Sequence, residues 1–178
     1  MTSKLIILIL LLGMNVRTYA QWNKVQNSSV NFKIKNAGIW VNGSFTKANV
    51  KVNIDEANPT QSTFSGIVES KSIQTGIKLR DNHLRDKDDF FNVEKFPTLN
   101  MKSVSVSIKS PGVYAVKWSL TIKGVTKLFT SDVNTNREGN TLNIFTNFAI
   151  NRNDWNIGGN SFTMGDNVSV KLSTSVIK

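Results

Sequence analysis

The sequence contains no cysteine among its 178 residues. Disulfide bonds, thiolate metal sites and cysteine nucleophiles are therefore excluded, so packing and hydrogen bonding alone must hold the fold together. Attachment of a lipid to an N-terminal cysteine is excluded for the same reason.

Histidine is almost as scarce, since His83 is the only one in the chain. A zinc site needs about three or four His, Cys or carboxylate ligands, which this chain can offer mainly as aspartates. The stretch RDNHLRDKDDFF, residues 80–91, gathers charge around His83. As a calcium loop starting at Asp86, however, it has Phe91 where the turn glycine belongs and Pro97 where the final glutamate belongs. A metal site is therefore disfavoured.

Catalytic motifs are also missing, because the sequence has neither Gly-x-Ser-x-Gly nor a glycine loop that cradles phosphate. His83 and Asp86 are three residues apart and can meet on a helix as an acid–base pair, whereas Asp81 and His83 face different directions. A surface histidine on a salt-bridged helix explains the pattern better. A lipid-modifying enzyme that uses His83 as its base is kept as an alternative.

Acidic residues are few, 12 against 22 lysines and arginines, which gives a net charge of +10. Such a balance suggests nucleic acid or an anionic membrane surface as a partner. The lysines nevertheless stand singly between apolar neighbours, as on the solvent face of a sheet. They are Lys33, Lys35, Lys51, Lys102, Lys117 and Lys171. We therefore expect no nucleic-acid binding and leave open a transient contact with a membrane surface.

Long apolar runs are absent except near the N-terminus, where Leu5–Leu12 follows Lys4 and Ala20 precedes Gln21. This layout predicts a secretory signal peptide over residues 1–20, cleaved after Ala20. The run is shorter than the ~20 residues needed to cross a bilayer, so an uncleaved anchor is the weaker alternative.

An exported protein without disulfides fits a bacterial periplasm better than an animal extracellular space, and we expect a periplasmic or secreted location. Residues 21–178 make up 158 of the 178 residues and fit a single domain with one sizeable core.

Period-two alternation of apolar and polar residues is abundant and is typical of half-buried β-strands. A change of phase after Met101 predicts a β-bulge near Ser103. About eight strands with short turns predict an antiparallel barrel or sandwich. The clearest alternating runs are Val30–Ile34, Val50–Ile54, Val104–Ile108, Tyr114–Ile122, Leu142–Ile150 and Val168–Val176.

Residues 75–91 break the strand pattern and predict a helical insertion with Thr75 as its N-cap. Asp81 and Arg85 stand four residues apart in the favourable acidic-first order for an ion pair. We expect Phe90 and Phe91 to turn inward as an aromatic plug at the barrel mouth, while the charges shape the outside of the segment.

A series of segments, in order along the chain, matches a known pattern. They are Ser29–Gly38, Val41–Phe45, Ser72–Gly76, Arg80–Arg85, Asp89–Phe91, Phe96–Pro97, Leu120–Lys127, Ile150–Trp155 and Asp166–Val170. Together they resemble the YceI-like family of exported, polyisoprenoid-binding bacterial proteins. The chain departs from that family at Ser28, Asn36 and Met101, where histidine, histidine and phenylalanine are common. The missing histidines bear on the polar end of a ligand more than on the fold.

The resemblance implies an all-β fold, an eight-stranded antiparallel lipocalin-like barrel, whose interior holds a polyisoprenoid-type lipid or similar long-chain amphiphile. It implies no catalytic activity and no cofactor other than such a lipid or a quinone-like one. Arg80 and Arg152 are candidates to meet an anionic head group. The predicted ligand contacts are Phe32, Phe64, Phe90, Phe91, Trp118, Phe148, Arg152 and Trp155.

The residues alone leave a second interpretation open, because an eight-stranded barrel can also be filled by its own side chains. The chain would then be a structural or partner-binding module in envelope stress. The partner that we expect is a hydrophobic small molecule or lipid, and a homodimer is one option for the oligomeric state.

Overall fold

A computed structural model describes residues 21–178, and the predicted signal peptide, residues 1–20, lies outside the described residues. The strands are β1 (Lys24–Asn36), β2 (Ile39–Phe45), β3 (Ala48–Asn53), β4 (Thr63–Glu69), β5 (Ile73–Gln74), β6 (Thr98–Ser110), β7 (Val113–Ile122), β8 (Val125–Glu138), β9 (Thr141–Asn151) and β10 (Asn167–Ile177). The helices are α1 (Lys78–Asp86) and the short 3-10 turns η1 (Pro59–Gln61), η2 (Ser70–Ser72) and η3 (Arg152–Trp155). Across residues 21–178, no helix is both long and apolar enough to span a membrane.

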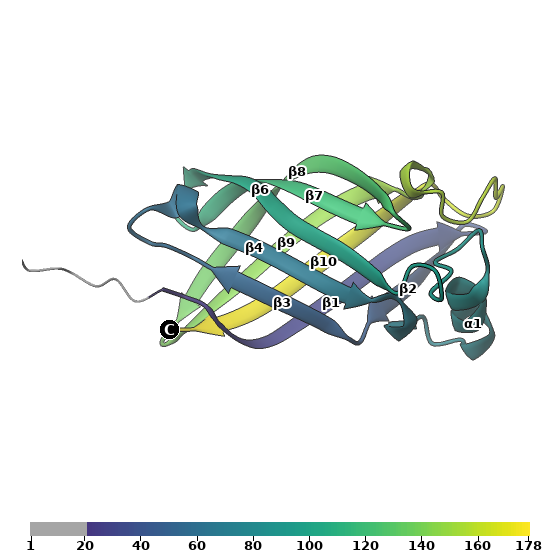
Figure 1. Cartoon of the computed structure of the whole chain (residues 1–178), viewed down its shortest axis with the longest axis horizontal. Coiled ribbons are helices and arrows are strands. Elements are labelled where there is room, and N and C mark those ends of the chain that lie inside the picture. The colour runs from purple at the N-terminus through teal and green to yellow at the C-terminus, as the bar shows by residue number, and fades with distance from the viewer. Residues whose placement is uncertain (1–20) are drawn as a thin grey trace, which may run out of the picture.

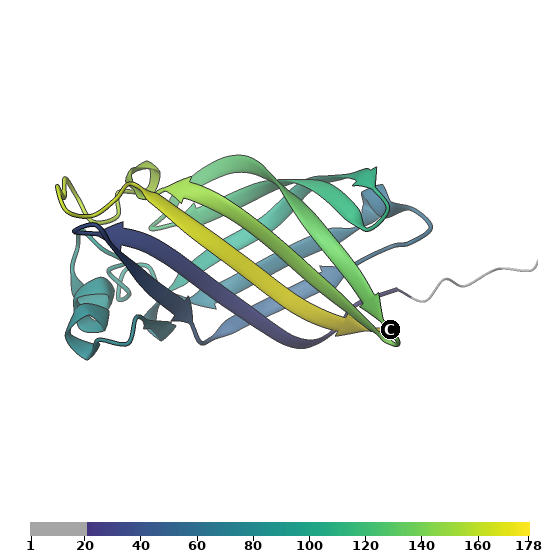
Figure 2. The same cartoon turned by 180° about the vertical axis from the view of Figure 1, so that it is seen from behind.

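The strands form one antiparallel sheet in the order β3-β4-β6-β7-β8-β9-β10-β1-β2-β5. The sheet curls on itself so that β3 lies beside β1. Two main-chain hydrogen bonds between Trp22, just before β1, and Ile54, just after β3, join these two strands there. The result is an elongated, incompletely closed barrel with α1 at one end and the C-terminus at the other (Figures 1 and 2).

The lipocalin-like all-β fold predicted from the sequence is confirmed, but the strand count is ten and the expected eight was wrong. β5 is only two residues long, so it is too short to show an alternating pattern. The sequence of β8 shows no clear alternation of apolar and polar residues. The polar Ser131 side chain forms hydrogen bonds in the interior, whereas the apolar Leu128 is exposed. Both strands follow from tertiary pairing more than from local pattern.

The predicted bulge in β6 is confirmed, since the pairing of β6 with β7 shifts register between Ser103 and Ser105. The shift places Met101 and Val106 on the interior face despite their odd spacing, because one extra residue restores the alternation. The Ser103 side chain also makes a bond of its own, because its Oγ accepts a hydrogen bond from the Phe64 amide at 3.0 Å.

The helical insertion is shorter than expected and its predicted cap was wrong. α1 spans Lys78–Asp86, and its N-cap position is Ile77, which makes no side-chain cap bond. The Thr75 hydroxyl instead bonds Asp81 and accepts from Arg80, and Gly76 follows in the left-handed region at φ 82°. Thr75 therefore ties the loop to the helix from outside the helix.

The expected ion pair between Asp81 and Arg85 was also wrong. Asp81 is buried and accepts a hydrogen bond from the Thr75 amide at 2.8 Å. Arg85 reaches the carbonyl oxygens of Lys71 and Ile73 at 2.9 and 2.8 Å. Both side chains therefore fasten α1 to the preceding β5 segment.

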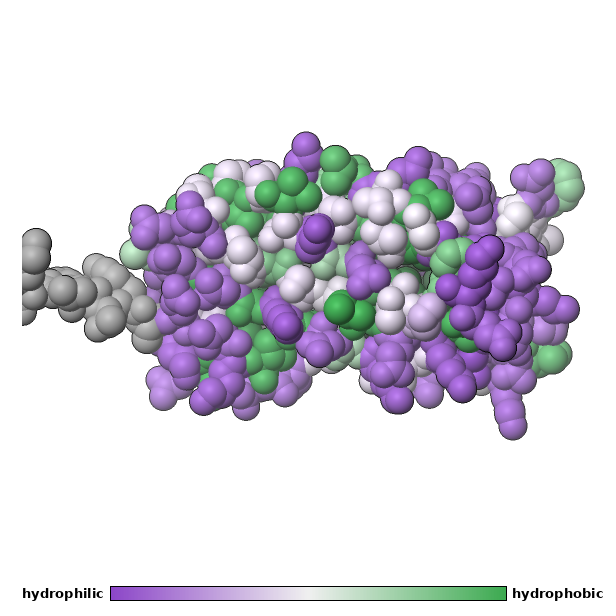
Figure 3. Space-filling model, viewed as in Figure 1, coloured by the Kyte–Doolittle hydropathy of each residue, from purple (hydrophilic) through white to green (hydrophobic). Residues whose placement is uncertain are grey.

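The outer surface carries the lysines that the alternation assigned to the solvent face. Lys33, Lys35, Lys51, Lys102, Lys117 and Lys171 are all exposed. Figure 3 shows hydrophilic side chains over much of this face, with smaller hydrophobic patches between them.

The barrel interior has a filled half near the C-terminus. Trp22, Val116 and Val176 there are completely buried, with 0% of their surface exposed. Alternate residues of the surrounding strands point inward and pack into one cluster. Its members are Trp22, Val52, Ile54, Phe64, Val106, Val116, Trp118, Val133, Leu142, Ile144 and Val176. We call this region the filled half.

Candidate functional site

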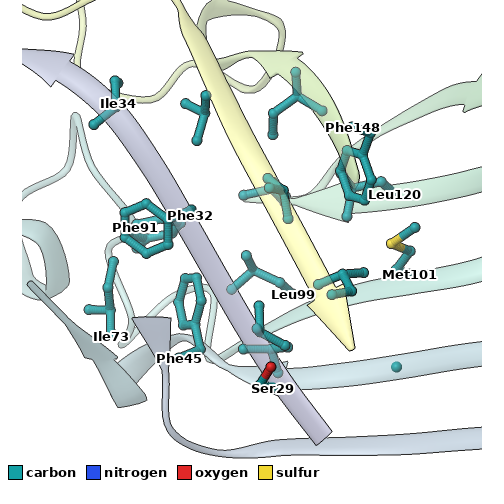
Figure 4. Close-up of a pocket in the computed structure, with 18 of the residues that line it drawn as sticks. Ser29, Phe32, Ile34, Phe45, Ile73, Phe91, Leu99, Met101, Leu120 and Phe148 are labelled. Atoms are coloured by element: carbon teal, nitrogen blue, oxygen red, sulfur yellow. The ribbon is translucent and has the colours of Figure 1, made fainter. Parts of the chain in front are cut away.

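The other half of the interior, toward α1, encloses a cavity of about 500 Å³. This volume falls within the ~300–1,000 Å³ typical of small-molecule sites. Its walls are almost entirely apolar and come from strands all around the barrel, as Figure 4 shows. The wall residues include Val30, Phe32, Ile34, Phe45, Leu99, Met101, Leu120, Phe148, Ile150, Val168, Val170 and Leu172. We call this region the hollow half.

Strand register builds one wall of the cavity. Phe32 of β1 pairs with Val170 of β10, which in turn pairs with Phe148 of β9, so the three form one interior row. On the other side of β1, Phe32 faces Gly43 of β2. The Phe32 ring occupies the space that a Cβ at Gly43 would need. Glycine at this position thus lets the ring lie against β2 and leaves the hollow open.

An aromatic group lines the part of the cavity nearest α1. The Phe45 ring lies 5.7 Å from that of Phe32 and meets Phe91 edge-on at 5.8 Å between centroids. Phe91 belongs to the segment after α1, and its edge-on contact with Phe45 places its ring among the cavity-lining residues that Figure 4 labels. The expected inward turn of Phe91 is therefore present, and Phe90 also lines the cavity.

A divergence between β8 and β9 shapes the opposite wall. The two strands pair only from Val133 and Thr146 onward, toward the filled half. Toward the cavity they separate, and the Phe129 and Phe148 rings meet across the divergence at 4.7 Å. Trp155 of η3 packs with Leu120 and Ile122 here and donates to the Leu120 carbonyl at 3.4 Å.

The floor of the cavity is the boundary with the filled half. Trp118 and Phe64 belong to the filled cluster and also line the cavity, with ring centroids 5.9 Å apart. Trp118 Nε1 donates to Ser131 at 2.9 Å, and the Ser131 and Thr146 hydroxyls are 2.9 Å apart. Because buried polar groups are costly when unpaired, this chain of bonds lets polar atoms occupy an apolar interior. The floor is thereby held in one arrangement.

The mouth of the cavity lies beside α1. Thr75, Ile77, Leu79, Arg80, His83 and Leu84 line it from one side. Asn36, Ile157 and Met164 line it from the β1–β2 turn and from the loop after η3. Ala37 donates its amide to the Thr163 carbonyl at 2.7 Å, which holds these last two segments together.

Arg80 is the cationic group at the mouth with bonding capacity left. Its Nε donates to the Thr75 hydroxyl at 2.7 Å and its Nη2 to the Thr75 carbonyl at 2.8 Å. An arginine offers five N–H donors and two are used here, so three, including both Nη1 hydrogens, remain without a partner among residues 21–178. The contacts fix the guanidinium in place and leave one edge of it for a ligand.

Arg152 has the opposite character, since only 2% of its surface is exposed. All five of its donors are occupied within the protein. They bond the carbonyl oxygens of Gly165, Ile157, Gly159 and Met164 and the Asp166 carboxylate, at 2.7 to 3.3 Å. Arg152 therefore organises the loop after η3, although it also borders the cavity.

Lys123, at the β7–β8 turn, braces the same end of the barrel. Its Nζ donates to the Asp88 carbonyl at 2.7 Å and to the Asn156 carbonyl at 2.9 Å. Burial lowers the pKa of Lys123, and the nearby Asp89 and Asp88 carboxylates partly offset that change. One lysine thus links the loop after α1 to the loop after η3.

His83 is exposed at the rim of the mouth. Within residues 21–178, its side chain makes no hydrogen bond or ion pair, so the acid–base pair with Asp86 is not formed. No group of three or more potential metal-ligating side chains occurs in this described part of the chain.

Seven of the eight predicted contact residues border the cavity: Phe32, Phe64, Phe90, Phe91, Trp118, Phe148 and Arg152. Trp155 does not, because it packs behind the wall through Leu120 and Ile122. Contact with a ligand stays a prediction for all eight. Sequence reasoning missed Phe45 and Val170, which could have been found from their places opposite Val30 and Phe32 once the strand register was known.

Comparison with known proteins places the chain among relatives of this architecture. The YceI-like domain model matches residues 22–176. A UPF0312 protein of Yersinia enterocolitica is 35% identical over 116 residues, which is 65% of this chain and 59% of that protein. The aligned part thus spans less than two thirds of this curated relative.

Solved structures show the same fold at low sequence identity. BcnA of Burkholderia cenocepacia has a TM-score of 0.79 at 23% identity, over 83% of this chain and 95% of its own. A polyisoprenoid binding domain from Saccharophagus degradans, described as implicated in plant cell wall breakdown, has a TM-score of 0.66 at 15% identity. That match covers 90% of this chain and 99% of the domain.

Proposed function

The chain belongs to the YceI-like domain family, and from that premise we propose that it binds a polyisoprenoid-type lipid or similar long-chain amphiphile. The binding site is the hollow half of the barrel. Through this site the protein carries or stores the lipid. The proposal also includes export of the chain and a periplasmic or secreted location, as the N-terminal 20 residues suggest.

The cavity is the observation that supports the proposal most. A hollow of about 500 Å³ with apolar walls is costly to keep empty, because its lining side chains lack contact partners. An apolar chain in the hollow contributes about 25 cal/mol for each Å² that it removes from water. Long unbranched or isoprenoid chains supply such area along an elongated barrel, so they suit this site better than compact polar molecules.

The chemistry of the mouth suggests how the ligand is oriented. The chain end of the ligand points toward Trp118 and Phe64 at the floor, and its polar end lies at Arg80. The free Nη1 edge of Arg80 suits an anionic group such as a phosphate. Arg152, whose donors are all occupied, has no role in holding the polar end.

The nature of the relatives supports a binding protein. The Saccharophagus degradans domain is described as polyisoprenoid binding, which names a ligand class that fits the apolar hollow. His83 stands without a carboxylate partner, which makes a lipid-modifying enzyme the weaker proposal. A filled structural module is weaker still, because only half of the interior is filled.

Native mass spectrometry of the chain purified without detergent from a bacterial periplasm tests this function. We expect one lipid per chain, identifiable after extraction, and uptake of added polyprenyl phosphate by delipidated protein. Absence of both a co-purifying lipid and uptake would contradict the proposal. A polar metabolite in the cavity would contradict it equally.

A further inference from the structure

Exposed apolar side chains gather at the mouth end of the barrel. Phe162 is fully exposed at 105%, Ile39 is 72% exposed and Trp40 is 49% exposed. Ile77 and Leu79, at the start of α1, are 53% and 66% exposed. We call these five residues the mouth rim. Figure 3 shows hydrophobic side chains protruding at the right-hand end, at the loop tip and beside α1.

The mouth rim comes from three separate segments that surround one opening. The β1–β2 hairpin contributes Ile39 and Trp40, the loop after η3 contributes Phe162, and the start of α1 contributes the rest. Each of the three segments also places residues in the cavity wall: Ile34, Asn36 and Val41; Ile157 and Met164; Thr75, Ile77, Leu79 and Arg80. Figures 1 and 2 show all three at the end opposite the C-terminus.

The charge of these segments is of one sign. Residues 33–41, 75–80 and 156–165 contain no aspartate or glutamate, and they carry Lys33, Lys35, Lys78 and Arg80. Lys33 and Lys35 lie over the Trp40 ring, with Nζ 4.9 and 5.2 Å from its centroid. Two acidic residues directly follow these segments, and both are engaged, since Asp81 accepts a hydrogen bond from the Thr75 amide and Asp166 pairs with Arg152. Asp88 and Asp89 lie beside Lys123.

Aromatic and aliphatic tips flanked by lysines are the composition of surfaces that lie at a lipid–water interface. The apolar tips enter the boundary between head groups and acyl chains, while lysines remain at the anionic head groups. We therefore propose that the mouth rim docks on an anionic lipid bilayer. The cavity then opens directly onto the membrane, so an apolar ligand enters it without crossing water.

This inference rests on the proposed lipid ligand for its purpose, but its test is independent of ligand binding. Residues 21–178, which hold every contact described above, are mixed with vesicles made of equal parts phosphatidylcholine and phosphatidylglycerol. Sedimentation measures the bound fraction. We expect binding that weakens strongly at ~1 M salt, where the screening length falls to about 3 Å. Vesicles of phosphatidylcholine alone should bind much less.

A matched pair of variants locates the surface. Ile39→Ser/Phe162→Ser removes two rim tips that do not line the cavity, and we expect the partition coefficient to fall about tenfold or more. Val104→Ser/Ile108→Ser is the control, because these residues are 53% and 55% exposed on β6, outside the three rim segments. The control should stay within about twofold of the unmodified chain.

A second pair separates charge from apolar contact. Lys33→Gln/Lys35→Gln and Lys102→Gln/Lys117→Gln remove the same net charge, from the rim and from the outer face of β6 and β7 respectively. We expect about a tenfold loss for the first pair and about twofold for the second, because charge acts within a Debye length of the surface.

Equal losses in the rim and control variants, or no vesicle binding by the unmodified chain, would overturn the docking proposal. A shift of the rim variant from dimer to monomer in sedimentation velocity, with unchanged vesicle binding, would make this surface an interface between copies and would also overturn it. Native mass spectrometry of the same proteins reports ligand content separately. Failure of docking and failure of the proposed function are thereby told apart.

Discussion

The filled and hollow halves of the barrel are made by the same strands and yet differ in what occupies the interior. β9 supplies Leu142 to the filled half, Ile144 to the boundary between the halves, and Phe148 and Ile150 to the hollow half. In the filled half, Trp22 crosses to the opposite edge and bonds Ile54, so the barrel is closed and packed. In the hollow half, loops and α1 take the place of a closing strand pair. The Trp22–Ile54 pairing, which we call the seam, and a few large side chains therefore determine which part of the barrel interior is filled. The alternation of apolar and polar residues alone does not determine it.

Trp22→Ala tests the filled half and has the largest expected effect. The side chain is completely buried, and its Nε1 donates to Glu56 at 2.9 Å. We expect a loss of about 3–5 kcal/mol in the free energy of unfolding, because a large cavity forms and the seam loosens. Urea unfolding measures it, with the exposed Trp40→Ala as the control at under ~1 kcal/mol. A loss below ~1 kcal/mol for Trp22→Ala would show that this end is not the stabilising half.

Arg152→Gln tests whether the loop at the mouth is held as firmly as the filled core. Several carbonyl oxygens lose their donors, and we expect a loss of about 2–3 kcal/mol in unfolding free energy. Hydrogen exchange should rise first at Ile157 and Met164, which bond Arg152 through their carbonyls. Unchanged stability with lower ligand affinity would instead assign Arg152 to the ligand.

A matched pair of valine substitutions compares the two halves directly. Val116→Phe overpacks the filled half, where Val116 is 0% exposed, and should cost about 1–3 kcal/mol of stability. Val170→Phe places the same ring in the hollow between Phe32 and Phe148, so stability should change by less than ~1 kcal/mol. Thermal and urea unfolding of both variants check this. Equal destabilisation would mean that the hollow half is as tightly packed as the filled half.

Arg80→Gln tests the polar end of the hollow half and should cost about 1 kcal/mol of stability, because two hydrogen bonds to Thr75 are lost. Affinity for polyprenyl phosphate should fall about tenfold, and affinity for the uncharged polyprenol should not change. Equal losses for both ligands would assign Arg80 to wall packing and not to an anionic group.

The smallest expected effect is on pH dependence at the filled end. The hydrogen bond from Trp22 is the main cause that lowers the pKa of Glu56 below 4.5, and burial opposes it. A carboxyl with a lowered folded pKa contributes stability above its unfolded pKa, and this contribution is lost as pH falls through the folded value. Below about pH 4.5, Glu56→Gln should therefore lose less stability than the unmodified chain. If plots of unfolding free energy against pH ran parallel for the two proteins, Glu56 would make no pH-dependent contribution to stability.

Much of the fold could be predicted from the sequence, because apolar and polar residues alternate along half-buried strands, as they do in Val168–Val176 and Tyr114–Ile122. None of the six alternating runs covers β2, β4, β5 or β8. Of these, β5 is created by tertiary pairing, and polar interior bonds disguise β8. The different hydrogen bonding of Arg80 and Arg152 could also not be predicted from the sequence. Both are arginines beside predicted elements. Only the loop carbonyl oxygens around Arg152 show that all hydrogen-bond donors of this side chain are occupied.

The hollow half itself could not be predicted from residue types, because Phe64 and Trp118 at the floor look the same in sequence as Phe32 and Phe148 in the wall. Whether aromatic rings meet across a barrel depends on register and on positions such as Gly43, where a missing Cβ moves a ring aside. The resemblance to the YceI-like family supplied that information in place of local pattern.

Calorimetric titration of delipidated protein with polyprenyl phosphate, for the unmodified chain, Val170→Phe and Val116→Phe side by side, tests the central claim most directly. We expect one site per chain in the unmodified protein, at least a tenfold loss of affinity in Val170→Phe and near-normal affinity in folded Val116→Phe. No binding by the unmodified chain, or equal affinity in all three proteins, would contradict the claim that the hollow half is a lipid site.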